Sequence, residues 1–495
     1  MICLIIPPSP FLLDERVFTS LGILRVAACL EKAGHEVEVL DLSGIENYLE
    51  AVDDYCKTTD ADTFCLTATT PQMPSAAKIG NRITLARPSS RLVLGGPHAT
   101  LVYAAFKKEM AKGLGGSGRA GRAGARLQDS FDVMVAGDGE RSIFEAVDPK
   151  HKGFIIDADD PKSDLFLTNQ TLNEMPFPAR HLIDLDSYHY SIDGERATSL
   201  ICQLGCPFGC GFCGGRASPM LRRVRTRTTE NVVEEMRHLY QTYGYKGFML
   251  YDDELNVNPQ MIPMMDAITK LQEELGVKFK LRGFIKSQLF TEQQGVAMYR
   301  AGFRWILTGF ESGSPRILQN IQKRSTREEN TRCVEIARRT GLKVKALMSL
   351  GHPGESPETI EDTRRWLMEN RPDDFDVTII TPYPGSPYYD DAVQNAEGDW
   401  VYTYEQTGDK LYAKEVDYFQ TADYYKGDPD GGYRSYVWTD SLSSDMLVSG
   451  RDDLERGVRK SLGISYNAAA PTVRFEHSMG QGLPEKILRR KGVPA

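Results

Sequence analysis

Four features that would place this chain in other classes of protein are missing. No apolar run approaches the roughly 20 residues that a helix needs to cross a bilayer, so we expect no membrane span. A basic excess is also missing, because 68 acidic residues outweigh 59 basic ones and the net charge is −9. DNA-binding proteins usually present a basic face, so we expect no DNA partner. The basic run Arg222–Arg227 is short and is expected to be a solvated flank of a helix.

The start of the chain lacks the signals of export. Met1–Pro7 has no basic region and no small-residue cleavage site, so it is expected to be a first strand and not a signal peptide. The nine cysteines also lack the pairing of a secreted disulfide framework. Four of them, from Cys202 to Cys213, lie within twelve residues. This clustering predicts a metal site in a reducing compartment, which favours a cytoplasmic protein.

The most informative part of this segment is the run Cys206-x-x-x-Cys210-x-x-Cys213. A 4Fe–4S cluster usually has four cysteine ligands, so three thiolates can bind three of its irons and leave the fourth iron open. A zinc site is the main alternative. Structural zinc takes four Cys or His ligands, generally in CxxC-like pairs, and Cys202 could supply the fourth. No second pair follows the run, so the spacing favours the cluster.

The first third of the chain alternates between apolar strands and helical patterns. The helical pattern that begins at Leu21 ends near Gly34, a residue type common just after helices. Such alternation predicts a Rossmann-like, doubly wound α/β domain with a parallel sheet over residues 1–150. Ligands of these sheets bind beyond the carboxyl ends of the strands, where the turns Gly95-Gly96 and Gly137–Glu140 lie. The strands are expected at residues 1–7, 37–40, 64–68, 92–94 and 133–136.

Glycine is concentrated between Lys107 and Ser130. This is the composition of a flexible linker, so residues 107–130 are expected to form a flexible surface insertion. A phosphate-binding loop is the more specific functional alternative, but the GK[ST] sequence that such a loop requires does not follow.

Beyond a linker over residues 151–196, a second α/β domain covers residues 197–390. Six strands are expected in it, at residues 197–201, 247–251, 278–284, 305–309, 344–350 and 377–380. A polar or glycine-rich turn follows each strand. Six such units predict a partial (β/α)6 TIM-type barrel that carries its chemistry at the strand ends.

Residues 391–495 are expected to form a small α-rich C-terminal region. The aromatic residues between Trp400 and Trp438 either cover a substrate pocket or form a small packed domain. The last thirty or so residues carry Gly, Pro and charge and are expected to be poorly ordered.

Motifs at the strand ends give the second domain a family resemblance. Gly309–Ser314, Gly351–Glu355 and Thr381–Pro387 accompany the cysteine run in order. Residues 195–390 therefore resemble the radical S-adenosylmethionine superfamily, and in particular its cobalamin-associated, class B methyltransferase-like branch.

The N-terminal domain resembles the cobalamin-binding domain that precedes many such barrels. The resemblance lies in Leu21–Val37, Leu94–His98 and Gly137–Glu140. The motif Asp-x-His-x-x-Gly, which supplies a histidine to cobalt in other cobalamin proteins, is absent, so His98 is expected to be a loop residue and not a cobalt ligand. The alternative is a sheet that binds no cofactor.

The resemblance implies three cofactors: a 4Fe–4S cluster, S-adenosylmethionine and cobalamin. It implies that Cys206, Cys210 and Cys213 are both the metal ligands and the catalytic residues. Asp253 and Glu254 could instead cap the next helix, and Glu311 could pair with Arg316 or Lys323. The implied S-adenosylmethionine ligands are Phe212, Asp252, Asp253, Glu254, Arg282, Glu311 and Ser312, and the implied cobalamin ligands are Thr69, Thr70, Gln72, Gly95, Gly96, His98, Gly137, Gly139 and Glu140.

The resemblance further implies an enzyme that cleaves S-adenosylmethionine reductively to a 5′-deoxyadenosyl radical and methylates an unactivated carbon of a small-molecule or natural-product substrate. Its other partner would be an electron donor such as flavodoxin or ferredoxin. The same two domains also serve cyclisation and rearrangement without net methyl transfer, which is the first alternative. A methylthiotransferase would need more cysteine ligands in the N-terminal domain, and a non-enzymatic cobalamin sensor would have no use for the cysteine run.

Overall fold

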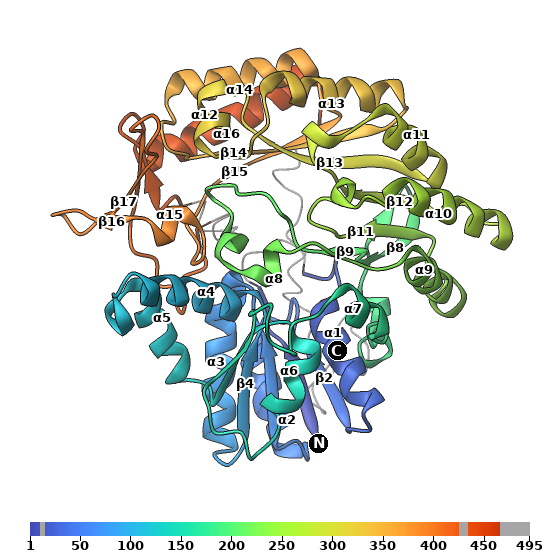
Figure 1. Ribbon diagram of the computed structural model, residues 1–495, viewed down its shortest axis with the longest axis vertical. Helices are drawn as coiled ribbons and strands as arrows, with labels where there is room; N and C mark the ends of the chain where they lie inside the picture. Colours follow the sequence, from blue (N-terminus) through green and yellow to red (C-terminus); the bar gives the residue numbers. More distant parts are fainter. Residues whose placement is uncertain (10–14, 425–433, 466–495) are drawn as a thin grey trace.

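The computed structural model of the protein describes residues 1–9, 15–424 and 434–465. Two mainly parallel sheets dominate these ranges, the N-terminal one below and a curved one above it (Figure 1). Within the described ranges, no helix combines the length and the apolar character needed to cross a membrane. The expectations for the last thirty residues, and for the aromatic stretch at residues 425–433, lie outside the described residues.

The N-terminal domain is the predicted doubly wound α/β domain. Its sheet has the strand order β2-β1-β3-β4-β5-β6, and every pairing in it is parallel. Helices cover both faces, which explains why strands such as β1 are apolar and buried throughout. The sixth strand lies beyond residue 150, inside the expected linker. The strands are β1 (Ile2–Ile6), β2 (Val37–Asp41), β3 (Thr63–Thr67), β4 (Arg91–Gly95), β5 (Val133–Gly137) and β6 (Ile155–Ala158), and the helices are α1 (Leu21–Lys32), α2 (Tyr48–Thr58), α3 (Met73–Ala86), α4 (Pro97–Ala111), α5 (Arg119–Gln128) and α6 (Gly139–Ala146).

Helix α5 corrects the expectation of a flexible insertion. The buried carboxylate of Glu109 on α4 accepts hydrogen bonds from the backbone N–H groups of Ala120 and Gly121, at 2.7 and 2.9 Å. An acidic group at a helix start satisfies free donors and complements the helix dipole. The guanidinium of Arg119 lies over the rings of Tyr389 and Trp400, at 3.8 and 4.5 Å. The glycine-rich composition therefore permits a helix that tertiary contacts hold in place.

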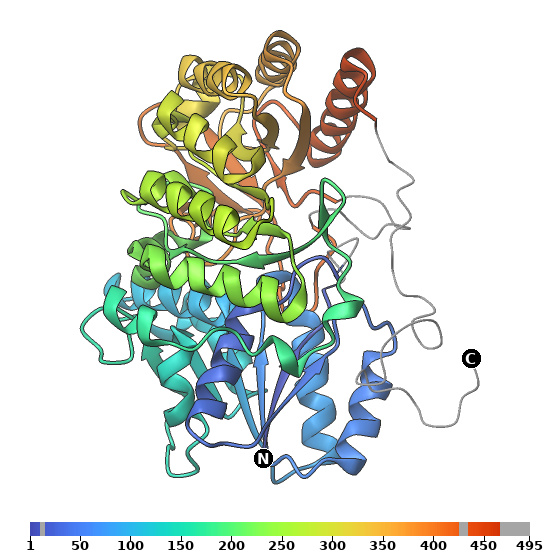
Figure 2. The same cartoon turned by 90° about the vertical axis from the view of Figure 1, so that its right-hand side faces the viewer.

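The second domain is the predicted partial barrel. Its sheet has the order β15-β14-β13-β12-β11-β8-β7, in which β8 to β15 pair in parallel and β7 pairs with β8 in antiparallel fashion. Helices pack along the outside of the curved sheet (Figure 2). The strands are β7 (Ser191–Ile192), β8 (Glu195–Leu200), β11 (Gly247–Leu250), β12 (Lys280–Phe284), β13 (Phe303–Glu311), β14 (Lys343–Leu350) and β15 (Asp374–Ile379), and the helices are α9 (Thr229–Tyr243), α10 (Met261–Leu275), α11 (Glu292–Ala301), α12 (Pro315–Asn320), α13 (Arg327–Arg339) and α14 (Pro357–Asn370).

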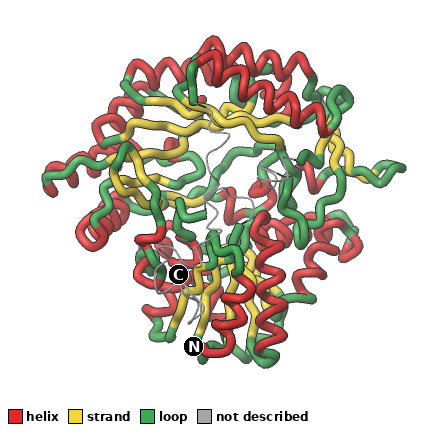
Figure 3. Tube along the Cα trace, turned by 180° about the vertical axis from the view of Figure 1, so that it is seen from behind, coloured by secondary structure: helices red, strands yellow, loops and turns green. Residues whose placement is uncertain are grey.

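Short elements connect the two domains. Helix α7 (Asn169–Glu174) follows β6, and β9 (Gln203–Leu204), α8 (Pro219–Arg222) and β10 (Arg225–Thr226) surround the cysteine run. Seen from behind, the curved sheet arches over the N-terminal sheet, and loops occupy the space between them (Figure 3). The loops at the strand ends of the two sheets therefore lie close to each other.

Buried ion pairs join the two domains. Asp138, which follows β5, pairs with Arg225 at 2.5 Å, and Glu235 on α9 pairs with both Arg180 and Arg227. Arg225 and Arg227 are buried, so the expectation of a solvated basic run is wrong for these two residues. Burial of a guanidinium is tolerated when a carboxylate faces it. The Asp138–Arg225 pair holds the segment after the cysteine run against the N-terminal domain, and Glu235 joins Arg180 of the linker to the same segment.

The C-terminal region contains a small antiparallel sheet that the sequence does not predict, in addition to its predicted helix. The helix, α16 (Ser444–Leu462), packs against α14 and β15. An aromatic cluster in this region includes Tyr389, Tyr418 and Tyr424, with Tyr383 packed against it. The remaining elements are α15 (Pro387–Asp390), β16 (Val393–Gln394), β17 (Trp400–Thr403), β18 (Lys410–Ala413) and β19 (Val437–Trp438).

Candidate functional site

The cysteine run forms a loop that neighbouring backbone holds at several points. Cys206 N–H donates to the carbonyl of Leu221 at 2.9 Å, just after the start of α8. Gly211 N–H donates to the carbonyl of Ile321 at 2.8 Å, just after α12. The loop is therefore fixed between two elements of the barrel domain, although it has little regular structure of its own.

The three thiols of the loop lie near enough to influence one another's pKa. Burial raises the pKa of Cys206 to about 11, and the neighbouring Cys210 acts in the same direction. The pKa of Cys213 is likewise raised by burial and by Cys210 and Cys206. Burial raises the pKa of Cys210, while the ammonium groups of Lys323 and Lys286 lower it. Iron binds the thiolate form, which the two lysines favour. Three free thiols beside two cations are a suitable donor set for an iron–sulfur cluster.

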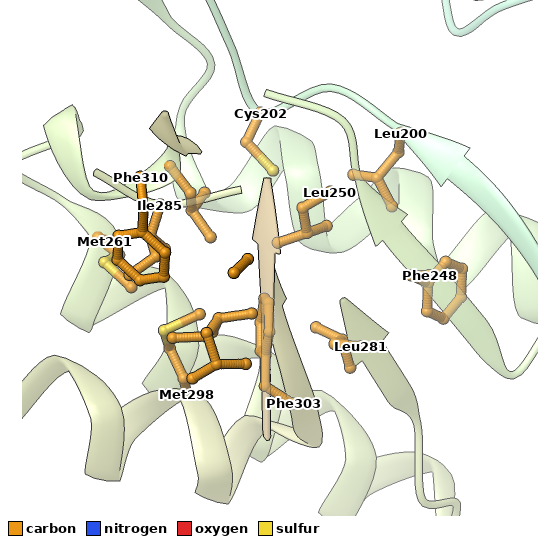
Figure 4. Close-up of a cluster of buried hydrophobic side chains, with 14 of the residues drawn as sticks. Leu200, Cys202, Phe248, Leu250, Met261, Leu281, Ile285, Met298, Phe303 and Phe310 are labelled. Carbon is orange, nitrogen blue, oxygen red and sulfur yellow. The ribbon is translucent and has the colours of Figure 1, made fainter. Parts of the chain in front are cut away.

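The fourth cysteine of the segment lies apart from this group. Cys202 is fully buried in the apolar core with Leu200, Leu250 and Ile285 (Figure 4). Burial raises its pKa well above the usual range of a thiol. In the described part of the chain, no three His, Cys, Asp or Glu side chains converge as ligands of a single metal ion. A cubane cluster does not require three ligands to converge on one ion, because each thiolate binds a different iron.

The acidic residues after β11 occupy three different environments. Asp252 is buried, and its Oδ1 accepts hydrogen bonds from the N–H groups of Cys202 and Gln203, at 2.8 and 2.5 Å. It therefore stabilises the start of the cysteine segment. Asp253 is exposed, and the side chain of Glu254 makes no capping bond at the short helix that follows. Burial raises the pKa of Glu254 to about 7, against the opposing effect of two lysines.

A buried ion pair lies at the end of β13. Lys323 Nζ donates to Glu311 Oε1 at 2.7 Å, which is the pairing that the sequence left open between Arg316 and Lys323. Arg316 instead pairs with Asp409. The ammonium of Lys323 lowers the pKa of Glu311, although burial alone would raise it. Glu311 and Lys323 therefore form a charged pair beside the cysteine loop.

The other residues expected around S-adenosylmethionine are Arg282, Ser312 and Phe212, and each contacts other side chains of the protein. Arg282 lies in the middle of β12, with its guanidinium 5.8 Å from the ring centroid of Trp305. Ser312 is buried, and its hydroxyl contacts Thr363 at 3.0 Å and accepts from the N–H of Ser314, so it shapes the turn into α12. Phe212 packs with its ring centroid 5.3 Å from that of His352.

The N-terminal sheet has a cavity of about 290 Å³ at the carboxyl ends of its strands. Gly95, Gly96, Gly137, Gly139 and Glu140 line it, as the sequence predicts. Apolar side chains make up most of the remaining wall, among them Leu4, Ile23, Val26, Val93, Val135 and Ile143.

Two kinds of glycine line this cavity. A Cβ on Gly95 would meet no atom within 4 Å, because it would enter open space. A Cβ on Gly96 would lie 2.6 Å from Thr67 Oγ1, and its φ of +93° lies in the left-handed region. The first kind keeps the cavity open and the second allows the turn into α4. This apolar space fits a flat organic group of a large cofactor such as cobalamin.

The loop after β3 and His98 were also expected to contact cobalamin, but they are not among the residues that line the cavity. Thr69 and Gln72 bond to each other at 3.0 Å, and Gln72 Nε2 donates to the carbonyl of Pro7 at 2.8 Å. His98 is buried, with its Nδ1 3.2 Å from Thr70 Oγ1, and burial lowers its pKa to about 4. His98 is the second residue of helix α4, so the expectation of a loop residue is wrong.

The two candidate sites share a wall. Leu204, Met220 and Leu221, which flank the cysteine loop on both sides, line the glycine-rich cavity together with the N-terminal strand ends. A ligand in the cavity would therefore contact the segment that carries the three thiols. A second, more open hollow of about 750 Å³ lies behind the loop, between α4, Arg216 and Tyr402.

Comparison with protein families matches both domains. The radical SAM superfamily matches residues 200–367, and the B12 binding domain matches residues 15–120. This chain is a radical SAM enzyme with a B12-binding domain. Its cofactors are accordingly a 4Fe–4S cluster, S-adenosylmethionine and cobalamin, and the thiols and the glycine-lined cavity are the places in this structure that fit them.

Relatives differ in the reaction for which they are named. An uncharacterized methyltransferase of Pyrococcus horikoshii is 27% identical over 80% of this radical SAM enzyme and 83% of that protein. An anaerobic magnesium-protoporphyrin IX monomethyl ester cyclase of Rubrivivax gelatinosus is 24% identical over 74% of this chain and 65% of that protein. The methyltransferase TsrM of Kitasatospora setae, solved with cobalamin and a [4Fe-4S] cluster, has the same fold, with a TM-score of 0.65 and 16% identity over 92% of this chain and 90% of that one.

Sequence reasoning named Lys323 only as a possible partner of Glu311 and gave neither Lys323 nor Lys286 a role in the site. Lys286 follows β12 and Lys323 follows α12, and both are almost fully buried. A lysine is rarely buried without an acidic partner, but nothing in the local sequence indicates that Lys323 is buried. The proximity of Glu254 and Glu311 becomes evident only when adjacent parallel strands bring their ends together.

Proposed function

We propose that this enzyme transfers a methyl group derived from S-adenosylmethionine to an unactivated carbon of a small-molecule substrate. The observation that carries the proposal is the shared wall: Leu204, Met220 and Leu221 line the glycine-rich cavity and flank the cysteine loop. The cluster and the cobalamin would therefore lie close together. The likeness over 80% of the chain to a protein named as a methyltransferase supports the same function.

In this proposal Cys206, Cys210 and Cys213 bind three irons and leave the fourth open. When bound, the cluster and S-adenosylmethionine supply a 5′-deoxyadenosyl radical, and cobalamin supplies a methyl donor. The protein's own contribution is to bind and orient these groups and to exclude water from them. Lys286 and Lys323 favour the thiolate form of Cys210 through their positive charge.

We assign the recognition of S-adenosylmethionine to charged groups beside the loop. Lys323 Nζ uses two of its three N–H groups on Glu311 and the carbonyl of Gly309. The third N–H remains for a carboxylate, so Lys323 replaces Arg282 in this role. Glu254 and Asp253 are the candidates for the amino group, since Asp252 is already bonded to backbone.

We assign the binding of cobalamin to the glycine-lined edge of the N-terminal sheet. Gly95 leaves space in the cavity, and Gly96, Gly137 and Gly139 allow close approach of backbone. Thr69 and Gln72 fix the neighbouring loop to the end of β1 and so support the edge from outside. An electron donor such as flavodoxin or ferredoxin would supply the electron.

The test uses reconstituted holoenzyme, a strong reductant and S-adenosylmethionine labelled in its methyl group, with a small-molecule extract as the source of substrate. We expect S-adenosylhomocysteine, 5′-deoxyadenosine and a labelled small molecule. Deoxyadenosine without S-adenosylhomocysteine or labelled product would contradict methyl transfer. That result would favour a cyclase or rearrangement enzyme, the second candidate, which the 24% identity to a cyclase supports.

A further inference from the structure

Four polar side chains of the barrel form a continuous row of hydrogen bonds (the file) that neither cofactor assignment uses. From one end to the other they are Glu311, Ser349, His352 and Tyr388. Ser349 Oγ lies 2.8 Å from Glu311 Oε2 and 2.8 Å from His352 Nε2. His352 Nδ1 lies 3.4 Å from Tyr388 Oη. All four residues are buried or nearly so, and they come from β13, β14, the turn after β14 and α15.

The direction of each hydrogen bond follows from the chemistry of the groups. The ammonium of Lys323 keeps Glu311 ionised, so Glu311 only accepts and Ser349 must donate its single hydroxyl proton to it. Ser349 then accepts from His352 Nε2–H. Burial lowers the pKa of His352 to about 4, so the ring is neutral and its Nδ1 accepts from the hydroxyl of Tyr388. One tautomer of His352 therefore satisfies the whole file.

One end of the file is Glu311, which pairs with Lys323 beside the cysteine loop. Glu311 has a φ of +65°, a conformation that costs a non-glycine residue free energy unless surrounding contacts maintain it. Its two carboxylate oxygens bond to Lys323 and Ser349. A Cβ on Gly309 would lie 2.5 Å from Glu311 Oε1, so only glycine leaves room for the pair.

The other end of the file contacts the cysteine loop itself. Tyr388 N–H donates to the carbonyl of Gly211 at 3.3 Å, and a Cβ on Gly211 would lie 2.9 Å from the Tyr388 ring. The ring of His352 packs against Phe212, with 5.3 Å between centroids. Gly211 and Phe212 stand between Cys210 and Cys213, so the file connects the loop to Lys323 through its side chains and one backbone hydrogen bond.

We propose that His352 is a positioning residue that holds the Lys323 ammonium at a fixed position relative to the cysteine loop. It acts on Lys323 through Ser349 and Glu311, and on the loop through Tyr388 and its own contact with Phe212. The proposal rests on the assignment of Lys323 to the carboxylate of S-adenosylmethionine. It predicts that the file determines the affinity for S-adenosylmethionine and leaves the iron content unchanged.

The test compares variants of the cluster-loaded, full-length protein by equilibrium binding of S-adenosylmethionine in the absence of substrate. His352→Phe keeps a ring against Phe212 but removes both hydrogen bonds, and Ser349→Ala breaks the file at a residue outside the loop contact. Each should retain its iron and bind S-adenosylmethionine about tenfold more weakly, the effect of losing a hydrogen bond to a charged group. Tyr388→Phe should have a smaller effect, because it removes the longest bond. His352→Gln, which keeps a donor for Ser349, should restore most of the affinity.

Thr331→Val is the matched control, since Thr331 Oγ1 accepts from Trp366 Nε1 at 3.0 Å within the same domain but outside the file. It should lower the midpoint of thermal unfolding without weakening the binding of S-adenosylmethionine. The proposal is wrong if Ser349→Ala binds S-adenosylmethionine as tightly as wild type, whatever His352→Phe does. It is also wrong if Thr331→Val weakens binding equally. Because no substrate is present, the result is independent of whether the product is methylated or cyclised.

Discussion

The glycine-lined edge of the N-terminal sheet and the interior of the barrel bury opposite kinds of side chain. The cavity of the first is walled by glycines and by apolar residues such as Leu4 and Ile23. The second encloses Lys286, Lys323 and Glu311, all charged and nearly inaccessible to solvent. The two proposed sites therefore differ in kind, since the first would recognise its ligand by shape and the second by charge. A change in volume should therefore damage only the first, and a change in charge only the second.

The largest expected effect comes from the thiols. Cys210→Ala should abolish both the binding of a full cluster and the formation of deoxyadenosine, while cobalamin binding, measured by absorbance, persists. The reason is that the six cysteines outside the loop are all buried and cannot replace the missing thiol. Cys333→Ala, which removes a buried cysteine on α13, is the control and should keep its iron. Wild-type iron content in Cys210→Ala would contradict the assignment of the cluster.

Removal of the buried cation should have the next largest effect. Lys323→Met leaves Glu311 unpaired in the interior and should lower the free energy of unfolding by about 3 kcal/mol. It should also prevent saturation with S-adenosylmethionine. The double variant Lys323→Met/Glu311→Gln should regain most of the stability without regaining binding, as measured by urea unfolding and equilibrium dialysis. Normal binding by the double variant would show that charge is not what the barrel recognises.

A change in volume tests the N-terminal domain. Gly95→Val places a side chain in the open space of the cavity and should weaken cobalamin binding at least about tenfold, through overpacking, without affecting the iron content. Gly124→Val is the control, because a Cβ there also meets no atom within 4 Å but lies on α5 and outside the cavity. Equal cobalamin affinity in wild type and Gly95→Val would place the cofactor elsewhere.

The smallest effect is a change in pH dependence. Burial raises the pKa of Glu355 from 4.5 to about 7, against hydrogen bonds from Thr359 and the backbone. The folded state thus holds this proton more tightly than the unfolded chain does. Its stabilising contribution is complete below about pH 4.5 and is lost as the pH rises through about 7. Glu355→Gln should therefore lose less stability than wild type over this range in urea unfolding, and parallel curves would contradict the assignment.

Periodicity predicted most of the regular structure because it depends on local chemistry. The strands of both sheets appear close to their expected positions, since buried parallel strands are nearly continuous apolar runs. The cysteine run and the turns Gly95-Gly96 and Gly137–Glu140 were identifiable because each lies at a strand end. The same reasoning failed for residues 119–128, where Glu109 and Tyr389 stabilise a helix in a sequence typical of a linker.

The sequence could not predict in the same way which side chains of the candidate site pair with one another. Glu311, Lys323 and His352 come from separate units of the barrel, and their contacts depend on the register of β13 against β14. The bulge between Gly309 and Glu311 shifts that register and turns the carboxylate toward Lys323. Arg225 and Arg227 likewise have the composition of a solvated run, and only the folded chain brings Asp138 of the N-terminal domain and Glu235 of α9 to them.

The sequence by itself determined the fold class and the three clustered cysteines, because spacing along the chain is enough to specify strands, helices and a loop rich in thiols, and the two cofactor-binding domains followed from its resemblance to known families. Only the tertiary structure decided that Asp252 serves the backbone, that Lys323 faces the loop in place of Arg282, and that His352 connects the two. The physical reason is that burial and pairing of charge depend on residues far apart in the chain. Such contacts arise when strands align, and a one-dimensional pattern does not contain them.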